Sequence, residues 1–305
     1  MTDVWTAESC TTEAFYLGES CRWDEVRQEL YWVNVDAGEF FRASADGKRL
    51  DVIQRFDLGG YVTAVAPMED RRNGWLVARD QSLFSLSESG DLVELASPEA
   101  RNVGAVRTND GAADPWGRYW IGSMALDEGE GRGSLYSFHE STELRTVLSG
   151  VTISNGIGWS PDHRSMYYVD SGPATIFIFD VDNKGDVTHQ RVFAQLDAAS
   201  EGTPDGLYVD AEGAIWVALW GGYEVRRYAA SGEIIGRVKL PTAQPSCCAI
   251  GGANATTLYI TTARENMSPE ILEKEPEAGR LFCVDVGVGA AAINPYRPHL
   301  REFVV

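Results

Sequence analysis

Six similar segments recur along the chain, each with an aromatic residue inside a short apolar stretch. The first is LYWV at residues 30–33, and the last is LYIT at residues 258–261. Their aromatic anchors follow one another at intervals of about 43 to 48 residues and are Trp32, Trp75, Trp120, Tyr168, Trp216 and Tyr259. A repeat of this length is typical of a propeller blade of four strands. Because six copies fill the chain, the sequence predicts an all-β fold, a six-bladed β-propeller of four-stranded antiparallel blades around a central channel. The blades are expected to form a single domain over residues 1–305.

The two ends of the chain are expected to close the ring. The sixth repeat is one strand short, and we expect Val4–Ala7 to supply its missing outer strand, so that no sheet edge is left open. Short helical turns are expected around Asp197–Ser200 and Ser268–Lys274.

The composition limits the kinds of partner that the protein can bind. Asp and Glu number 45 against 26 Lys and Arg, which gives a formal net charge of -19. Such a surface repels nucleic acid and anionic membranes, and no apolar run approaches the roughly 18 residues that indicate a membrane span. No secretory signal is visible at the N-terminus, so a cytoplasmic location is expected. A small molecule is the expected partner, and the sequence carries no signal for the oligomeric state.

Cysteine and histidine chemistry is not favoured. The five cysteines contain no Cys-x-x-Cys pair, so buried, reduced thiols are expected rather than a disulfide framework or a zinc knuckle. None of the four histidines pairs with a credible serine nucleophile, and no Gly-x-Ser-x-Gly segment is present.

Polar side chains occupy equivalent positions in four repeats, about 11 to 14 residues before the aromatic anchor; they are Glu19, Asn109, Asn155 and Asp205. This position is the expected start of the innermost strand of a blade, so these side chains should converge at one mouth of the channel. Glu19, Asn155 and Asp205 together offer oxygen ligands and two negative charges, a set that a hard divalent cation prefers. The sequence therefore predicts a metal site formed by these three residues.

A structural explanation of the same residues also exists. Asn155-Gly156 and Asp205-Gly206 are common turn pairs, and they could simply cap strands. The shared phase in four repeats favours the metal site, because turn residues usually lie between strands and these residues precede the innermost strand. Most other carboxylates are expected only to keep the protein soluble.

Several motifs resemble the SMP-30/gluconolactonase/regucalcin family, and they keep their order along nearly the whole chain. They are LGES at 17–20, RTNDG at 107–111, DPWGRYW at 114–120, SNGIGWSPD at 154–162, PDGL at 204–207 and LYITTA at 258–263. The resemblance implies a six-bladed propeller that hydrolyses sugar lactones with the help of a metal ion. One departure is visible: the family's Gly-Glu-Gly-Pro is Gly-Glu-Ser-Cys at 18–21, so the ligand is kept and the proline is lost.

The resemblance also assigns roles to particular residues. By motif, the family's metal ligands fall on Glu19, Asn155 and Asp205. Its substrate-binding arginine and asparagine fall on Arg107 and Asn109, and an acidic residue that contacts sugar hydroxyls falls on Asp127. For Arg107, a surface ion pair is the alternative.

The function expected from these residues is hydrolysis of an aldonolactone to the corresponding aldonic acid. In this hypothesis one divalent cation polarises the lactone carbonyl, Asp205 takes the proton of the attacking water, and Arg107 and Asn109 orient the sugar ring. Ca²⁺ is the cation expected first. Mn²⁺, Mg²⁺, Zn²⁺ and Fe²⁺ stay open, because oxygen ligands and water molecules can hold each of them.

Two other functions stay open at this point. A related metal-dependent propeller esterase would act on other esters, such as aryl esters or organophosphates. A non-catalytic propeller would bind calcium or a protein partner. The glycine-rich segment 129–133 is expected to form a loop over the channel mouth, where it could gate the entry of substrate.

Overall fold

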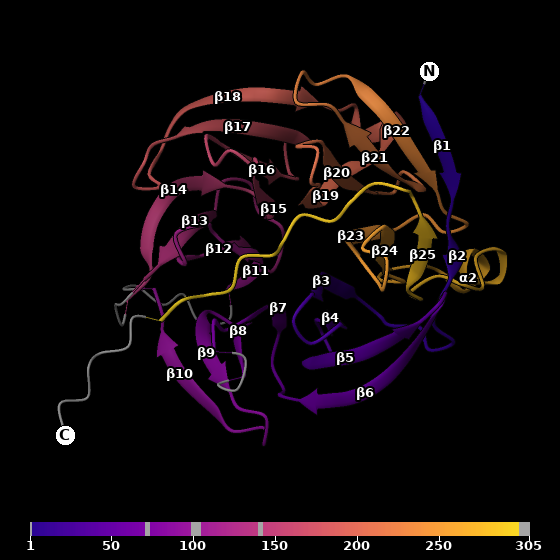
Figure 1. The fold of residues 1–305 in the computed structure, drawn as a ribbon, viewed down its shortest axis with the longest axis horizontal. Coiled ribbons are helices and arrows are strands. Elements are labelled where there is room, and N and C mark those ends of the chain that lie inside the picture. The colour runs from indigo at the N-terminus through magenta and orange to yellow at the C-terminus, as the bar shows by residue number, and fades with distance from the viewer. Residues whose placement is uncertain (1, 71–73, 99–104, 140–142, 299–305) are drawn as a thin grey trace.

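The computed structural model of the protein describes residues 2–70, 74–98, 105–139 and 143–298, and Figure 1 shows them as a ring of sheets. Within these residues the strands form six sheets arranged around an axis, which confirms the predicted six-bladed β-propeller. The innermost strand of each sheet packs against the innermost strands of the two neighbouring sheets. In chain order these strands are β3 (Gly18–Asp24), β7 (Val62–Pro67), β11 (Val106–Ala113), β15 (Ser154–Trp159), β19 (Thr203–Val209) and β23 (Pro245–Gly251).

Each blade then continues outwards through antiparallel neighbours. The second strands are β4 (Glu29–Asn34), β8 (Trp75–Arg79), β12 (Tyr119–Ala125), β16 (Ser165–Asp170), β20 (Ile215–Trp220) and β24 (Thr257–Thr262). The third strands are β5 (Glu39–Asp46), β9 (Ser82–Leu86), β13 (Gly133–Phe138), β17 (Thr175–Val181), β21 (Glu224–Tyr228) and β25 (Phe282–Asp285). The outer strands are β6 (Arg49–Asp57), β10 (Leu92–Ala96), β14 (Arg145–Val151), β18 (Val187–Gln195), β22 (Ile234–Lys239) and β2 (Glu8–Ser9).

The repeated aromatic anchors hold neighbouring blades together. All six lie on the second strands, and each is at most 1% exposed. Tyr259 in the last blade stacks on Trp23 in the first, with ring centroids 5.7 Å apart, and Trp120 meets Trp159 of the next blade at 5.9 Å. Because such pairs bury large apolar rings between sheets, the period seen in the sequence is the period of the contacts between blades.

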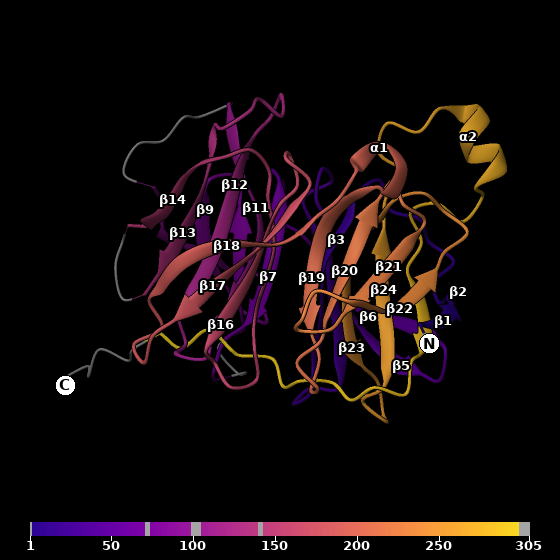
Figure 2. The same ribbon diagram turned by 90° about the horizontal axis from the view of Figure 1, so that it is seen from above.

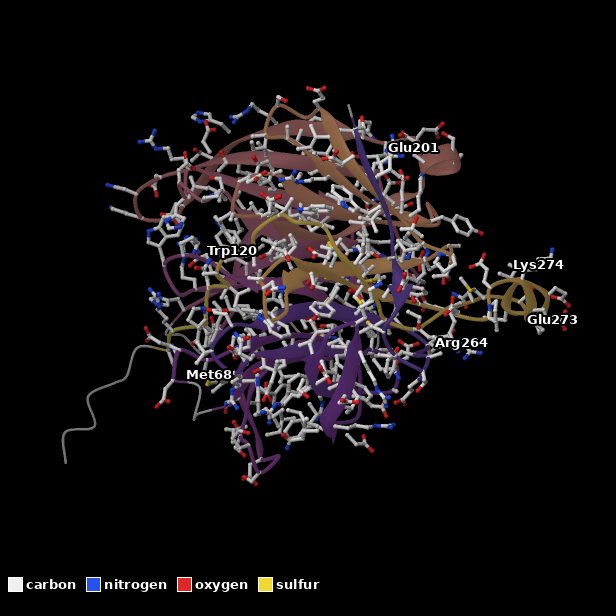
Figure 3. All side chains as sticks on the ribbon, turned by 45° about the vertical axis from the view of Figure 1, so that its right-hand side comes forward. Met68, Trp120, Glu201, Arg264, Glu273 and Lys274 are labelled. Atoms are coloured by element: carbon white, nitrogen blue, oxygen red, sulfur yellow. The ribbon has the colours of Figure 1, made fainter. Side chains whose placement is uncertain are left out.

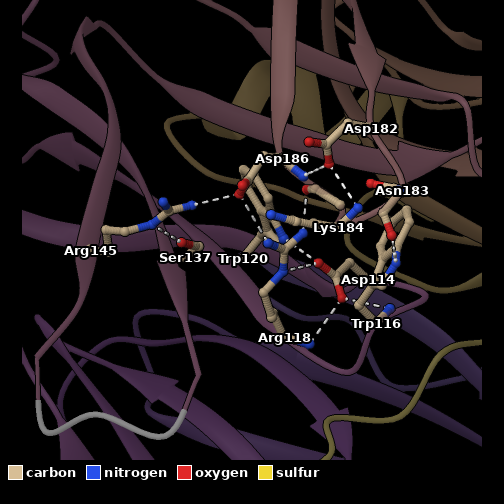
Figure 4. Close-up of polar contacts among 11 residues, drawn as sticks. Asp114, Trp116, Arg118, Trp120, Ser137, Arg145, Asp182, Asn183, Lys184 and Asp186 are labelled. Atoms are coloured by element: carbon tan, nitrogen blue, oxygen red, sulfur yellow. Dashed lines mark hydrogen bonds and ion pairs between the residues drawn. The ribbon is translucent and has the colours of Figure 1, made fainter.

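A buried aspartate fixes the anchor in the third blade, as Figure 4 shows. Asp114 follows β11, and its Oδ1 accepts hydrogen bonds from the backbone N–H groups of Trp116 and Arg118, both at 2.9 Å. Its Oδ2 accepts from Nε of Arg118 at 2.6 Å and from Nε1 of Trp120 at 2.9 Å. Asp210 repeats this arrangement in the fifth blade, where its Oδ2 accepts from Nε1 of Trp216 at 2.9 Å. The DPWGRYW motif is therefore a structural one, which closes a hairpin and orients the anchor.

The N-terminal segment closes the ring, but not as the sequence analysis predicts. The outer strand of the last blade is Glu8–Ser9, which pairs with β25. Most of the expected segment Val4–Ala7 belongs instead to β1 (Asp3–Thr6). This strand pairs in parallel with β22 and adds a fifth strand to the preceding blade. The prediction of Val4–Ala7 as the outer strand of the sixth blade is thus wrong, because the segment crosses between two blades and covers the edges of both.

Both expected helical turns are present as short helices. α1 (Ala198–Glu201) begins after Asp197, whose side chain accepts a hydrogen bond from Ala199 N, and α2 (Pro269–Lys274) begins after the cap residue Ser268. Figure 3 shows α2 standing out from the ring, with the side chains of Glu273 and Lys274 directed away from it. In the described part of the chain no helix is long and apolar enough to cross a membrane.

The C-terminal segment runs across one face of the ring, and α1 and α2 lie at the other, as Figure 2 shows. Two contacts tie the segment down. Ala291 N donates to the hydroxyl of Tyr208 at 2.9 Å, and Tyr296 N donates to the carbonyl of Pro67 at 3.0 Å. The segment therefore covers the mouth of the channel at which β7 and β19 end, and the other mouth, where β19 begins after α1, stays open to ligands.

Candidate functional site

Five of the six side chains singled out in the sequence line one cavity of about 1080 Å³. They are Glu19, Arg107, Asn109, Asn155 and Asp205. Each belongs to an inner strand, and the five come from four different blades. The propeller therefore brings together residues that are up to 186 positions apart in the sequence, as the shared phase of the repeats predicts.

A break in the strand pairing aims these side chains at the channel. In the fourth blade the register between β15 and β16 shifts between Ser154 and Ile157, which leaves Asn155 and Gly156 in a bulge. The fifth blade shows the same shift between Pro204 and Leu207, around Asp205. Bulges redirect side chains and are frequent beside functional sites. Asn155 and Asp205 therefore lie inside strands, and the interpretation of their Asn-Gly and Asp-Gly pairs as turns between strands is wrong.

The glycine after each of these residues is explained by how closely the inner strands approach the axis. A Cβ atom on Gly156 would lie 2.6 Å from the backbone nitrogen of Leu207 in the next blade. A Cβ atom on Gly206 would lie 2.7 Å from the Cα atom of Cys247, again in the next blade. Any side chain here would push neighbouring blades apart, so glycine is needed for close approach rather than for a turn.

A chain of hydrogen bonds connects the polar groups along the cavity wall. Nη1 of Arg107 donates to Oδ1 of Asn109 at 2.5 Å, and Nδ2 of Asn109 donates to Oδ1 of Asn155 at 2.9 Å. Nδ2 of Asn155 donates in turn to Oγ of Ser171 at 2.8 Å, and that hydroxyl donates to the carbonyl of Pro204 at 2.7 Å. The amide of Asn155 is thus held at both ends, and its oxygen keeps a second lone pair for a ligand.

The two carboxylates of the predicted metal site line the same cavity, Glu19 half-buried and Asp205 buried. Asp205 is 6% exposed, and its Oδ1 has no hydrogen-bond partner among the described residues. Burial, followed by the negative charge of Glu19, raises the pKa of Asp205 well above its usual range. Burial and the charge of Asp110 raise the pKa of Glu19 to about 8, although Ser20 N donates to its Oε2 at 3.0 Å. Both shifts have the same leading cause, which is the loss of solvation of the charged form, and a neighbouring negative charge adds to each.

These residues fit a divalent cation. The described residues contain no group of three or more His, Cys, Asp or Glu side chains that could hold a metal, so a third protein ligand would be a neutral oxygen. Asn155 supplies that oxygen, and Glu19 and Asp205 supply two negative charges. A hard cation would give the unpaired Oδ1 of Asp205 a partner and would offset the repulsion that raises both pKa values.

An ion pair that the sequence analysis does not anticipate closes the channel beneath this set. Nη2 of Arg22 lies 3.2 Å from Oδ1 of Asp110, and Nη1 of Arg22 donates to the carbonyl of Cys21 at 2.9 Å. Arg22 precedes the anchor of its blade by only ten residues, outside the phase of the predicted site. Asp110 follows a predicted site residue directly, but Asp110-Gly111 has the composition of a turn.

Carboxylates at the rim of the cavity are also missed by the sequence analysis. They are Asp36, Glu128, Glu130, Asp170 and Glu265, and they line the same cavity as the inner-strand residues. All five lie at or shortly after the end of a second strand, in the connection to the third strand. An acid in this connection is only a partial signal in the sequence, because five of the six blades carry one and Asp80 of the second blade does not line the cavity.

Asp127 is the one predicted site residue that the structure does not bring to the cavity. Its side chain is 71% exposed, forms an ion pair with Arg132 of the same loop, and accepts a hydrogen bond from Gly129 N at 3.2 Å. The next residue, Glu128, does line the cavity. The loop lies at the cavity mouth, as expected, and Gly131 N in it donates to Oγ1 of Thr152 at 3.2 Å.

All five cysteines are free and buried, as expected. Cys247 and Cys248 lie within the inner strand β23 and are fully buried. The bulge in that strand lies between Pro245 and Cys247, at the position where other blades carry polar site residues. The inner strand of the sixth blade therefore supplies none of the polar site residues.

Comparison with known proteins points to one family. Residues 17–264 match the sequence model of the SMP-30/gluconolactonase/LRE-like region. Human regucalcin is 34% identical over 290 residues, which is 92% of this chain and 93% of that protein. The 6-deoxy-6-sulfogluconolactonase of Pseudomonas putida is 30% identical over 277 residues, 90% of this chain and 93% of that protein. The crystal structure of regucalcin from Agrobacterium tumefaciens, described as a calcium-binding protein, superimposes with a TM-score of 0.88 at 28% identity and covers 97% of this chain and 100% of that one.

Proposed function

Because this chain belongs to the SMP-30/gluconolactonase/LRE-like family, we propose that it hydrolyses a sugar lactone to the corresponding aldonic acid with the help of one divalent cation. The observation that carries the proposal is the unpaired, buried Oδ1 of Asp205, in a cavity that Glu19 and Asn155 also line. An unsatisfied carboxylate oxygen in such a place is costly unless a ligand uses it.

Glu19, Asn155 and Asp205 would hold the cation through their side-chain oxygens. When bound there, a divalent ion supplies Lewis-acid polarisation of a substrate carbonyl. Ca²⁺ is the ion proposed first, since the donor set contains only oxygen and the Agrobacterium relative is described as calcium-binding. Mn²⁺, Mg²⁺, Zn²⁺ and Fe²⁺ are tested beside it. The proposed partner is a small lactone, and a cytoplasmic location is proposed.

Asp205 is proposed to act as the general base. One oxygen of its carboxylate would hold the cation, and the other would accept the proton of the attacking water. Water that attacks the lactone carbonyl transfers a proton to Asp205, the acyl–oxygen bond of the ring breaks, and Asp205 returns that proton to the ring oxygen, which leaves as a hydroxyl group. The products are the carboxylate of the open-chain acid and one proton.

Arg107 and Asn109 are proposed to orient the sugar. One guanidinium nitrogen of Arg107 is used by Asn109 and by the carbonyl of Thr108, so the guanidinium plane is fixed and its remaining donors are available at the cavity wall. Such a fork suits the oxygens of a hydroxylated ring better than an apolar ester. The guanidinium also lies over the ring of Tyr61, with 5.9 Å from its central carbon to the ring centroid, which further fixes its position.

Two alternatives use the same cavity. A metal-dependent esterase for aryl esters is disfavoured by the polar lining, in which carboxylates and amides outnumber aromatic side chains. A non-catalytic calcium-binding propeller is favoured by one observation, the description of the Agrobacterium relative as a calcium-binding protein.

Acid release from a panel of substrates separates the three functions. Five- and six-membered aldonolactones and a set of aryl esters are incubated with the protein, with and without a chelator, and proton release is followed at constant pH. The proposal predicts hydrolysis of at least one aldonolactone that the chelator suppresses. Hydrolysis of aryl esters only would support the esterase, and calcium binding without any acid release would support the non-catalytic propeller.

A further inference from the structure

The charges that surround the cavity are strongly one-sided. Apart from Glu19 and Asp205, five carboxylates line it, and among the described lining residues the one basic side chain is Arg107. Even with a divalent cation balancing Glu19 and Asp205, formal charges leave this lining with four more negative than positive charges. A cleft lined by charges of one sign focuses their field into the space between its walls.

Arg107 does not reverse this field, because acidic residues act on it from several sides. Burial lowers the pKa of Arg107, and the negative charges of Asp36, Glu265 and Glu19, in that order, oppose the change. Asp36 lies in the connection between β4 and β5, and Glu265 follows β24, so the two come from neighbouring blades. Among the described residues, the guanidinium donates hydrogen bonds to neutral oxygens of Thr108 and Asn109. The carboxylates of Asp36 and Glu265 thus act on Arg107 at longer range, and all three residues line the cavity that a substrate would enter.

We propose that this acidic rim, with Asp36 and Glu265 as its specificity-determining residues, restricts the enzyme to uncharged, hydroxyl-rich lactones and excludes lactones that carry an acidic substituent. The inference rests on the proposed function. The inferred substrate preference differs from that of the Pseudomonas relative, whose name describes a lactonase for a sulfonated sugar. A neutral lactone offers hydroxyl groups that donate hydrogen bonds to the rim carboxylates, whereas a sulfonate, phosphate or second carboxylate offers only acceptors and a like charge.

The same field acts on the product. Hydrolysis converts a neutral lactone and water into an aldonate anion and a proton, so the ligand gains a negative charge inside an acidic cavity. Repulsion from the rim therefore favours release of the aldonate. Weak product inhibition is expected for the same reason that anionic substrates are rejected.

The test compares a neutral ligand with its anionic counterpart in both binding and turnover. Glucono-1,5-lactam, a hydrolysis-resistant neutral analogue, and the same lactam with a 6-sulfonate are titrated into the metal-loaded protein by calorimetry. In parallel, kcat/KM is measured for glucono-1,5-lactone and for its 6-sulfonated analogue. We expect the neutral compound to be favoured by about tenfold or more in both measurements, and the preference to shrink as salt is raised.

Variants assign the preference to the two named residues. Asp36→Asn with Glu265→Gln should reduce the preference for the neutral compound by about tenfold, because it removes the two charges that act most strongly on Arg107. Glu233→Gln is the matched control. Glu233 is exposed in the turn between β21 and β22. The cavity-lining Trp220 lies just before the other end of β21, so removing the charge of Glu233 should leave the preference unchanged. If the double variant unfolds, Asp36→Asn alone serves, since Asp36 is exposed in a turn.

The outcomes distinguish this inference from the proposed function. Equal or tighter binding of the sulfonated lactam by the unchanged protein would overturn the inference, even if lactones are hydrolysed. Selective binding of the neutral lactam that the double variant loses would support it, even if no lactone is turned over and the proposed function fails. Failure of both lactams to bind would overturn the inference, and failure of every aldonolactone to be hydrolysed would overturn the proposed function.

Discussion

Nδ2 of Asn109 donates a hydrogen bond of 2.9 Å to Oδ1 of Asn155, so a residue proposed to bind substrate holds a residue proposed to bind the cation. The two amides come from neighbouring blades, and Asn109 also donates to the carbonyl of Ser154 at 2.9 Å. Groups that orient a metal ligand in this way commonly change metal affinity by about 10- to 100-fold when they are removed.

Asn109→Ala is therefore expected to weaken divalent-cation binding by about 10- to 100-fold and to raise KM for the lactone as well. Competition with a fluorescent chelator measures the first effect, and initial rates at saturating cation measure the second. Asn183→Ala is the control, because Asn183 is exposed in the turn between β17 and β18. Unchanged cation affinity in Asn109→Ala would show that the hydrogen bond does not support the metal site.

The metal-free protein is expected to lose stability as the pH rises from about 5 to 8. In the folded state burial and nearby acids raise the pKa of Glu19 from 4.5 to about 8 and also raise that of Asp205. Over this pH range the folded chain therefore binds more protons than the unfolded chain, so the free energy of unfolding falls with increasing pH. Added Ca²⁺ should reverse the trend, because the cation binds the deprotonated carboxylates and stabilises the folded state.

Thermal unfolding in chelator and in excess Ca²⁺, from pH 5 to pH 8, measures this dependence. The double variant Glu19→Gln, Asp205→Asn serves as the reference, because it keeps the shape of both side chains and removes their titration. A midpoint that falls equally in the variant and in the unchanged protein would assign the pH dependence to other groups.

The loop at the cavity mouth offers a comparison between adjacent acids. The prediction that Asp127 contacts substrate stays a prediction, and the structure adds Glu128 as a second candidate, because Glu128 lines the cavity and Asp127 pairs with Arg132. We expect Glu128→Gln to change KM for the lactone by more than Asp127→Asn does. Steady-state kinetics of the two variants decides between them, and a larger effect of Asp127→Asn would mean that the loop rearranges when substrate binds.

Asp114 is expected to affect stability rather than catalysis. Its carboxylate accepts hydrogen bonds from Trp116, Arg118 and Trp120 and is fully buried. Asp114→Ala should lower the free energy of unfolding by about 3–5 kcal/mol, because it leaves Nε1 of the buried Trp120 without its acceptor and takes from Arg118 the closer of its two carboxylate partners. Denaturant unfolding measures the loss. Asp182→Ala is the control, since that exposed turn aspartate accepts only from two backbone N–H groups, and its loss should cost about 1 kcal/mol. Equal losses in the two variants would contradict the structural role of the motif.

The blade repeat could be predicted because each repeat buries one large aromatic side chain at the same place. Such a side chain is visible in the sequence, and Trp120 and Trp216 fill equivalent positions in the structure. The same logic located Asn155 and Asp205, whose strands begin at one mouth of the channel. It did not reveal the bulges, because an Asn-Gly or Asp-Gly pair has the same composition in a turn and in a bulge, and only the approach of the next blade distinguishes them.

Other parts of the structure depend on tertiary contacts that leave little trace in the sequence. The outer strand Glu8–Ser9 has two residues, too few for an alternating pattern, and its place is set by pairing with β25. Asp36 and Glu265 lie in connections whose lengths and compositions differ between blades, so no common phase marks them. Arg22 faces the channel from a strand that is buried on both sides, where an isolated charge in the sequence does not show what it pairs with.

Cation binding and lactone hydrolysis, measured on the same metal-stripped samples, test most directly whether Glu19, Asn155 and Asp205 hold a catalytic cation. The protein is titrated with Ca²⁺, and then with the other candidate ions, while hydrolysis of an aldonolactone is followed beside Asp205→Asn. We predict that about one ion binds per chain, that hydrolysis rises in proportion to occupancy, and that Asp205→Asn loses activity by a factor of about 10² to 10⁴ at saturating cation. Undiminished hydrolysis in the stripped protein, or full activity in Asp205→Asn, would contradict the proposed site.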